Sequence, residues 1–470
     1  MNQVALSDKT KPVRSRERIL LVVLFTVHLI INGYLVVIHE PWRDEVHAWL
    51  ITQYMSVPEM IAFSRYEAHP ILWNLILLPF AKTGAPIWTM NVISYICVSI
   101  SAGLFVFKTK VHTLAKILIL FTVPFVYTYS SLARNYCLIL LLGMIISVLY
   151  SKRLEHPIIY SICVSMLVFT HSMAWGFVAG ITITFHIKEI IAKVFKKSLL
   201  ERKNFCSVCI GFGLIVLSTV FAVITLYGKR SAVLSVFQSE NTDNVILSML
   251  LLLLMCFIYL LFTKGRMWKE ALIIGTSFLF MIVIYKTVSS AVIFQRLILI
   301  PVYSLLVLII IFSEYKDLSK INKTCIYFIF LCSIIFNGCM VQTFKNIKED
   351  ISREYSSARE MARYINQNLP DEETILVDTG IMSQTIVPYT DKTLFDIRYE
   401  ARIVDSLYHV IETDEIIQKV LDIPNHSEYN GMYFITVYNY QNSAFEEIYR
   451  TSKSISGENF ILYRIKLQQD

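Results

Sequence analysis

The chain has 470 residues, of which 55% are hydrophobic and only 17% are charged, and its mean hydropathy is +0.55. These values exclude an ordinary soluble globular domain and indicate a polytopic α-helical membrane protein. A net charge of +7 would favour a nucleic-acid partner only if the basic residues clustered on one folded domain. They lie between hydrophobic runs instead, so we expect no nucleic-acid partner.

Eleven hydrophobic runs are long enough, or nearly long enough, to span a bilayer. The first follows a basic leader and lacks a small-residue cleavage pattern, so we expect a retained anchor rather than a signal peptide. The predicted spans are 18–38, 87–107, 113–128, 132–150, 156–170, 172–187, 205–227, 244–263, 270–287, 295–312 and 324–341.

A further short run, Ile71 to Phe80, decides the topology. If it lies flat as an interfacial helix, Lys and Arg are consistently more frequent in the loops on one side of the membrane. If it spans, every later loop is inverted. We therefore expect a cytoplasmic N-terminus, a first external loop at 39–86 and an external C-terminal region.

The sequence divides into two domains, a transmembrane domain at 1–341 and a polar region at 342–470. A helix followed by strands in the second region predicts a soluble extracytoplasmic α/β domain, with a supporting or acceptor-recognition role. The expected helix is Ile351 to Asn368, and the expected strands are Thr374 to Asp378, Gly431 to Tyr438 and Phe460 to Ile465.

Ionisable residues gather in the first external loop at the membrane edge, where they are costly and usually functional. Asp44 and Glu45 would point about 100° apart on a helix, which does not suit a symmetric glycosidase pair. One carboxylate is enough when the leaving group is a phosphate ester, because Arg and His can supply the counter-charge. The alternative is that both acids cap a helix that begins near Val46.

Five segments carry a resemblance to a known family. Asp44-Glu45-Val46-His47 resembles the D-E-x-H stretch of dolichyl-phosphate-mannose protein mannosyltransferases, and Glu67-Ala68-His69-Pro70-Ile71-Leu72 resembles their D-x-H-P-P-L. The segments similar to bacterial members are Tyr129-Ser130-Ser131-Leu132-Ala133-Arg134-Asn135-Tyr136, Phe169-Thr170-His171-Ser172 and Gln295-Arg296-Leu297-Ile298-Leu299-Ile300-Pro301. In this order the motifs resemble the superfamily C (GT-C type) glycosyltransferases, which include bacterial aminoarabinose transferases. The departures are Glu67, Ile71 and Leu297.

The resemblance implies an inverting glycosyltransferase that moves a sugar from a polyprenyl-phosphate donor to an acceptor hydroxyl at the external membrane face. It implies that Asp44 is the catalytic base and that Glu45 is an assisting acid. The residues that it places near the donor phosphate are His69, Arg134 and Arg296. The candidate supporting residues are Arg43, His47, Glu67, Tyr136 and His171.

Each supporting role has a structural alternative. His47 could simply satisfy the loop backbone, and Tyr136 fits an aromatic belt at the membrane interface. Arg134 and Arg296 could be interfacial anchors, and His171 is open between the two interpretations. No cofactor is required. A divalent metal is left open, because no spacing among Asp44, Glu45, Glu67 and His69 is diagnostic of a metal site.

The composition favours a bacterial cytoplasmic (plasma) membrane, with undecaprenyl phosphate as the lipid carrier and an envelope glycan, lipid or protein as the acceptor. The main alternative is a transporter or flippase of lipid-linked sugar, which would carry charges along a path through the membrane and symmetry between its halves. Neither feature is evident in the sequence. A noncatalytic scaffold for envelope assembly would tolerate Asp44→Asn.

Overall fold

A computed structural model defines the fold. The residues that it describes are 15–67, 69–122, 124–195, 201–226, 253–261, 263, 266–287, 299–338, 340–378, 381–407, 422–423 and 426–466.

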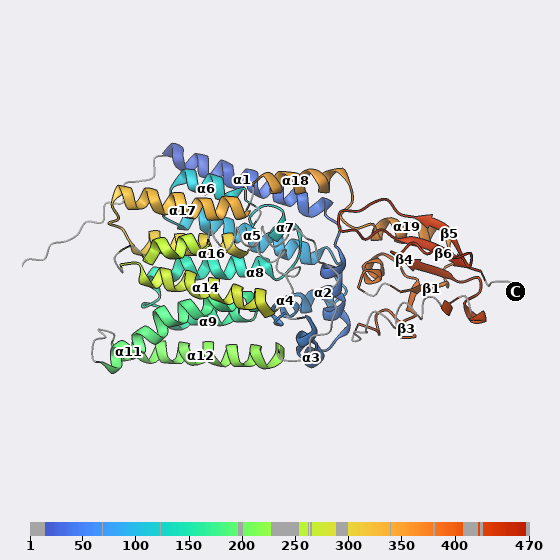
Figure 1. The fold of residues 1–470 in the computed structure, drawn as a ribbon, viewed down its shortest axis with the longest axis horizontal. Coiled ribbons are helices and arrows are strands. Elements are labelled where there is room, and N and C mark those ends of the chain that lie inside the picture. The colour runs from blue at the N-terminus through green and yellow to red at the C-terminus, as the bar shows by residue number, and fades with distance from the viewer. Residues whose placement is uncertain are drawn as a thin grey trace, which may run out of the picture.

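Helices lying side by side form the larger part of the molecule, and the C-terminal sheet lies at one end of them (Figure 1). Within the bundle, α5 packs on α1 and α8, α16 contacts α8, α14 and α17, and α12 lies against α9. The helices of the bundle are α1 Ser15–Ile38, α5 Thr89–Lys108, α6 Thr113–Leu120, α8 Tyr136–Leu149, α9 Pro157–Val168, α10 Trp175–Thr182, α11 Lys188–Val194, α12 Arg202–Leu226, α14 Trp268–Thr287, α16 Leu299–Glu314 and α17 Lys320–Gly338.

Three helices among the described residues are long and apolar enough to cross a membrane, judged by length and composition. They are α1, α5 and the stretch Asn204–Leu226 of α12. Shorter apolar helices accompany them at Leu72–Ala81, Tyr136–Lys152, Pro157–Val168 and Pro301–Glu314. The fold is therefore that of a helical, membrane-associated protein, whereas the eleven expected spans exceed the three helices that meet this criterion.

Several predicted spans are interrupted, which explains part of this difference. The run 113–128 is helical only as far as Leu120, and the short helix α7 (Thr128–Ser131) follows. Pro124 lies between the two, and a proline cannot donate the backbone hydrogen bond that continues a helix. The run 172–187 divides into η2 (Ser172–Ala174), α10, and a π-helical turn at Ile183–Ile187. Much of the run 244–263 lies outside the described residues.

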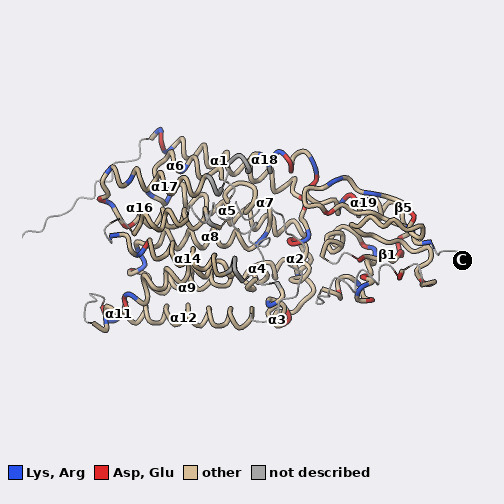
Figure 2. The backbone as a smooth tube through the Cα atoms, viewed as in Figure 1, with Lys and Arg blue, Asp and Glu red and all other residues tan. Residues whose placement is uncertain are grey.

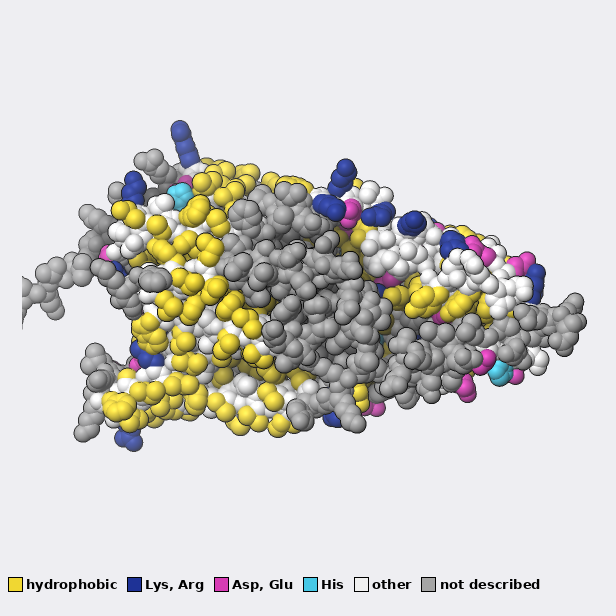
Figure 3. All heavy atoms as spheres, viewed as in Figure 1, with side chains coloured by type: hydrophobic (Ala, Val, Ile, Leu, Met, Phe, Trp, Pro, Cys, Tyr) yellow, Lys and Arg dark blue, Asp and Glu magenta, His cyan; other side chains and the backbone are white. Residues whose placement is uncertain are grey.

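The surface of the bundle exposes apolar side chains, as a lipid-facing surface requires. Val37 on α1 and Leu217 on α12 are 79% and 68% exposed. Apolar side chains cover much of the visible bundle in Figure 3, and most Lys, Arg, Asp and Glu residues lie at the bundle ends and over the C-terminal domain (Figure 2). Such a distribution favours a bilayer around the middle of the bundle.

The segment predicted as the first external loop is folded into helices. They are α2 (Arg43–Tyr54), α3 (Val57–Glu67) and α4 (Leu72–Ala81). Helix α4 corresponds to the short apolar run that begins at Ile71, and it packs on α2 with Trp73 and Leu77 buried. This group of helices lies at the end of the bundle that faces the C-terminal sheet (Figure 1).

The C-terminal region forms a mixed sheet of six strands in the order β3-β2-β1-β4-β6-β5. β1 pairs in parallel with β2 and β4, and the other pairings are antiparallel. The three strands expected from the sequence correspond to β1, β4 and β6. The strands are β1 Thr374–Val377, β2 Thr393–Asp396, β3 Ala401–Arg402, β4 Tyr433–Thr436, β5 Phe445–Arg450 and β6 Ile461–Ile465.

The single helix expected at 351–368 is instead two helices, α18 (Met340–Ser352) and α19 (Ala358–Asn368). α19 buries Met361, Ala362 and Ile365 against Ile375 and Val377 of β1 and their neighbours, so its apolar face covers the sheet. The 3-10 turn η5 (Ser383–Tyr389) packs on both α19 and α2. The C-terminal domain therefore touches the site-bearing helices directly.

Two buried carboxylates join the membrane domain to the C-terminal domain. Glu40, just after α1, accepts the backbone N–H of Arg359 in the first turn of α19 at 2.8 Å. In return, Glu458 of the C-terminal domain accepts the backbone N–H of Arg43 in the first turn of α2 at 2.9 Å. Each carboxylate satisfies a helix N–H group that has no partner within its own helix, at the positive end of the helix dipole. The two domains thus cap each other.

Burial raises the pKa of Glu40 to about 8; Arg359 acts to lower this pKa, while the charges of Glu354 and Glu458 raise it further. A carboxyl whose pKa is higher in the folded state stabilises the fold most below about pH 4.5, and this contribution is lost as the pH rises through about 8. We expect Glu40→Gln, which keeps an oxygen for the Arg359 N–H, to raise the unfolding temperature by about a few degrees at pH 9 and hardly at pH 5. Thermal unfolding in detergent measures it. The exposed Glu372→Gln is the control, and equal shifts at both pH values would contradict the expectation.

Candidate functional site

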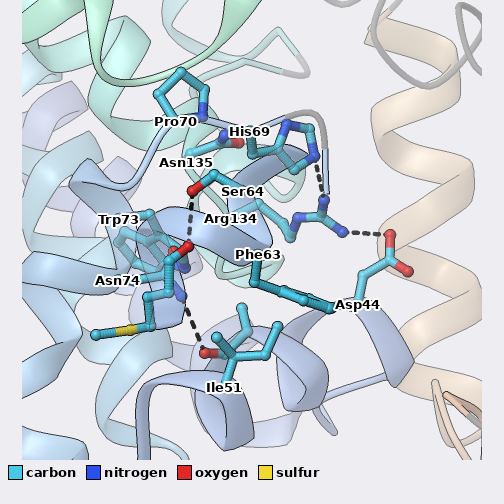
Figure 4. A pocket seen from close by; sticks show the side chains of 12 residues that line it. Asp44, Ile51, Phe63, Ser64, His69, Pro70, Trp73, Asn74, Arg134 and Asn135 are labelled. Atoms are coloured by element: carbon cyan, nitrogen blue, oxygen red, sulfur yellow. Dashed lines mark hydrogen bonds and ion pairs between the residues drawn. The ribbon is translucent and has the colours of Figure 1, made fainter. Parts of the chain in front are cut away.

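A pocket opens at the sheet-facing end of the bundle, among α2, α3, α4 and the turn before α8 (Figure 4). The space between its lining atoms, open solvent included, is about 460 Å³. It contains three of the residues predicted from the sequence to act together, Asp44, His69 and Arg134. The full lining is Asp44, Ala48, Ile51, Met60, Phe63, Ser64, His69, Pro70, Trp73, Asn74, Arg134 and Asn135.

Asp44, Arg134 and His69 form a connected polar chain in the pocket (Figure 4). Nη1 of Arg134 forms an ion pair with Oδ2 of Asp44, and Nη2 lies 3.0 Å from Nε2 of His69. Because a guanidinium can only donate, Nε2 of His69 is the acceptor in this contact. Arg43 adds a weaker contact, with its Nε 3.8 Å from Oδ1 of Asp44. The Asp44 side chain remains 28% exposed, so a molecule in the pocket can reach it.

Glu45 points away from the pocket into the protein, where it is fully buried. Its Oε2 accepts from the backbone N–H of Trp42 at 3.2 Å and lies 2.9 Å from Nε2 of His39. Its Oε1 accepts from Asn91 Nδ2 at 3.0 Å and from the backbone N–H of Ala133 at 2.5 Å. Both oxygens are thus fully engaged. The two adjacent acids have different surroundings, because successive residues of α2 face different directions.

The start of α2 agrees in part with the helix-cap alternative considered for the two acids. The helix begins at Arg43, three residues earlier than expected, and Glu45 accepts the backbone N–H of Trp42 at the N-cap. A carboxylate in this position satisfies an unpaired helix donor. Asp44 instead contacts Arg43 and Arg134, so the cap interpretation describes Glu45 and not Asp44.

His39 is a contributor that the sequence analysis did not single out. It is buried between Glu45 and Asp350, with Nδ1 3.5 Å from Oδ2 of Asp350. Burial alone would lower its pKa, but the two carboxylates outweigh that effect and raise it to about 9. A protonated His39 therefore neutralises charge on Glu45. The sequence feature that could have identified His39 is its position directly after the first hydrophobic span and next to an acid.

A strained turn leads into α7, in the same connection between α6 and α8 that contains Arg134. Tyr127 has φ of +80° and ψ of −74°, and the N–H of Thr128 bonds to the carbonyl of Val126 at 3.2 Å, which together define a γ-turn. The side-chain oxygen of Asn32, buried in α1, accepts from the backbone N–H of Tyr127 and from the hydroxyl of Ser130. Strain of this kind persists only where the surroundings enforce it.

Two predicted supporting residues, His171 and Tyr136, pack beside His69. The ring centroids of His69 and His171 are 4.7 Å apart, and Tyr136 stacks on His171 at 5.5 Å. Nδ1 of His171 accepts the backbone N–H of Met173, which fixes the orientation of its ring. Tyr129 continues the stack at 5.7 Å from Tyr136. Tyr136 and His171 therefore adjoin the site instead of facing only the membrane interface.

The remaining predicted residues lie elsewhere or outside the described part. His47 is buried on another side of α2, where its Nδ1 donates to Oε1 of Gln384 at 2.6 Å and so ties α2 to η5. Glu67 is the last residue of α3, but its side chain is outside the description. Arg296 lies in the stretch 288–298, which is outside the described residues.

The described residues contain no group of three or more His, Cys, Asp or Glu side chains arranged to hold a metal ion. Asp44 and Glu45 diverge, so they do not act as a joint pair of ligands. His69 is in contact with Arg134, a group that repels a cation.

A second, larger cleft lies on another face of α2, against the C-terminal domain. It holds about 1200 Å³ including open space, and Gln53 and Tyr54 of α2 line it opposite Tyr389 and Arg402. On α2 these residues are displaced from the row formed by Asp44, Ala48 and Ile51 in the first pocket. The helix therefore separates two hollows.

The pocket also contains residues that the sequence analysis did not predict. Trp73 and Asn74 come from α4, and Asn135 from the turn before α8. In the family motif that the Arg134 segment resembles, the position of Asn135 accepts any residue. No periodicity distinguishes such residues in advance, because neutral side chains on apolar helices carry no charge signal.

Comparison of the sequence with models of known protein families and with curated proteins finds no match.

We expect Glu45→Gln to destabilise the protein by about 3 to 5 kcal/mol, because the amide nitrogen, itself a donor, would face other donors and buried His39 would lose one of its two carboxylates. The measurement is the unfolding temperature in detergent. The neighbouring Asp44→Asn is the matched control, since Asp44 is partly exposed and we expect its loss to cost about 1 kcal/mol or less. Equal stability of the two variants would contradict this assignment of Glu45.

Proposed function

We propose that the chain is a membrane glycosyltransferase of the superfamily C type, which transfers a sugar from a polyprenyl-phosphate donor to an acceptor hydroxyl. The observation that carries the proposal is the meeting of Asp44, His69 and Arg134 in one pocket at the end of an apolar helix bundle. These residues come from α2, from the turn before α4 and from the turn before α8. A general base beside phosphate-binding groups is the arrangement that this chemistry requires.

In the proposed reaction Asp44 accepts the proton of the acceptor hydroxyl as its oxygen attacks the anomeric carbon. The bond from that carbon to the phosphate oxygen breaks, and the bonding electrons leave with the phosphate. Attack from the side opposite the leaving phosphate inverts the anomeric carbon. Arg134, with its planar set of donors, stabilises the charge that develops on the phosphate, and His69 adjoins it.

The ion pair between Arg134 and Asp44 has a role in this scheme. Before donor binding, the guanidinium neutralises the carboxylate. A bound phosphate would compete for the same guanidinium, because both ligands are anionic oxygens. Asp44 would then become a stronger base at the moment when a donor is present. The arrangement couples occupancy of the pocket to activation of the base.

The membrane topology, the carrier lipid and the acceptor are part of the same proposal. The pocket lies at the end of the bundle next to the C-terminal domain, which we place on the external side of a bacterial cytoplasmic membrane, with the N-terminus inside. Eleven crossings would complete the membrane domain. Undecaprenyl phosphate would be the carrier lipid, and an acceptor from the envelope would approach from the side of the C-terminal domain, where the second cleft opens.

We expect Asp44→Asn to reduce sugar transfer by about 10² to 10⁴-fold, because the amide cannot accept the proton. Membranes with equal amounts of each variant are given radiolabelled polyprenyl-phosphate sugars and extracted envelope acceptors, and the labelled product is counted. Asp371→Asn, an exposed carboxylate of the C-terminal domain, is the control. Equal transfer by Asp44→Asn would exclude the base, and movement of labelled lipid across the bilayer without transfer would favour a flippase.

We expect Arg134→Lys to raise the KM for the lipid-phosphate donor by at least about 10-fold, because an ammonium cannot reproduce the paired contacts of a guanidinium. Initial rates at varied donor concentration measure the effect. Arg65→Lys on α3, whose guanidinium donates to a nearby backbone carbonyl outside the pocket, is the control. An unchanged KM would show that Arg134 does not bind the phosphate.

A further inference from the structure

Helix α18, which leads from the bundle to the C-terminal domain, has one face that is fixed by the protein. It follows α17 and packs beside the end of α1, where Ile347 joins an apolar cluster with Leu35. One turn later its Asp350 is buried, with Oδ2 3.5 Å from Nδ1 of His39, the residue that follows α1. The inner face of α18 therefore lies at the level where the apolar span of α1 ends (Figure 1).

The outer face of α18 combines exposed apolar and basic side chains. Phe344 and Ile351 are 62% and 54% exposed. Lys348 is exposed between them, one helical turn from each, and Lys345 is exposed directly after Phe344. An exposed strip of this composition, apolar and flanked by lysines, is typical of helices that contact a membrane surface.

The two lysines of this face have no ion-pair partner in the part of the chain that the structure describes. The acid one turn after Lys345 is Glu349, whose Oε1 lies 3.9 Å from Nη2 of Arg353 instead. An ammonium group that is free at a membrane surface attracts anionic headgroups. A lysine stem can also lie along apolar surface while its charge reaches the headgroup level.

The neighbouring surface of α1 favours a lipid as the molecule that covers this face. Ile30, Tyr34 and Val37 recur at helical spacing and are 66%, 52% and 79% exposed, as a lipid-facing stripe requires. Because α18 packs beside the same end of α1, its exposed Phe344 adjoins a surface that already faces lipid. The basic positions of α18 lie where the apolar bundle meets the C-terminal domain (Figure 2), which is the level of the phospholipid headgroups.

We infer that the outer face of α18 binds acidic phospholipids of the surrounding bilayer, with Lys345 and Lys348 on the headgroup phosphates and Phe344 against the acyl chains. The partner is the bilayer surface, so the inference does not rest on the transfer reaction. Since α18 leads directly into α19, the contact would hold the C-terminal domain close to the membrane.

Crosslinking from α18 in a bilayer tests the inference. The photoreactive residue p-benzoylphenylalanine replaces Phe344 in the full-length protein, which is placed in nanodiscs of equal parts phosphatidylglycerol and phosphatidylcholine. Mass spectrometry of the irradiated α18 peptide then identifies the attached lipid. We expect at least about threefold more phosphatidylglycerol than phosphatidylcholine in the adducts, within the roughly fivefold per lysine that attraction to acidic headgroups can give.

The control position is Leu217 on α12, which is 68% exposed on a stretch without Lys or Arg from Asn204 to Leu226. Its adducts should contain the two lipids in their bulk ratio. Absence of lipid adducts at position 344, or a bulk ratio there, would overturn the inference. Adducts with a second copy of the chain would overturn it in favour of self-association.

The lysines are tested by combining Lys345→Gln with Lys348→Gln in the same photoreactive protein. We expect the lipid ratio at position 344 to return to that of the bulk while the total yield of lipid adducts stays unchanged. The matched control combines Lys316→Gln with Lys320→Gln, which removes the same charge from exposed positions at the other end of the bundle. A preference for phosphatidylglycerol that survives the first pair of substitutions would exclude the two lysines.

The outcome is separable from that of the proposed function. A lysine-dependent preference for acidic lipid, in a protein that transfers no sugar, would support the inference and reject the transferase. Transfer that depends on Asp44, with no lipid preference at position 344, would do the reverse.

Discussion

A buried carboxylate with four hydrogen-bond donors is the interaction on which the site depends. Glu45 draws its donors from the segment after α1, from the N-cap of α2, from α5 and from the turn before α8. An ionised group inside a protein is stable only when it is paired and hydrogen-bonded, so these four segments cannot move apart independently. The same constraint fixes the direction of α2 and places Arg134, the residue after Ala133, at the edge of the pocket. One side chain therefore sets the geometry of several others.

The two adjacent acids have different roles: Glu45 is structural, and Asp44 is the proposed base. Glu45 is enclosed and fully bonded, while Asp44, one residue earlier on the helix, reaches a pocket with an arginine beside it. The strained γ-turn at Tyr127, held by Asn32 of α1, lies in the same connection between α6 and α8 as Arg134. Rigid support on both sides is what precise placement of a base and a cation requires. Stability is thus concentrated around the atoms proposed to react.

Much of the fold could be predicted from the sequence, and the features that could not be predicted have identifiable physical causes. Hydropathy indicated a helical membrane protein, and alternation of apolar residues located β1, β4 and β6, because burial imposes these periods directly. The meeting of Asp44, His69 and Arg134 followed from ordered motifs. The roles of Glu45 and His39 did not, because they depend on which way α2 turns and on Asp350, more than 300 residues further along the chain. Trp73 and Asn135 carry no pattern, since a neutral polar atom becomes informative only when its surroundings are known.

The reciprocal capping of the two domains has a consequence for biosynthesis. Glu458, which caps the first turn of α2, follows Arg43 by 415 positions along the chain. The helix that carries Asp44 therefore lacks this contact until translation has passed Glu458. It gains the contact only when the C-terminal domain has folded against it. A chain truncated or stalled before Glu458 would hold every residue of the pocket and still leave α2 incompletely anchored, so the site depends on a contact made after all its own residues.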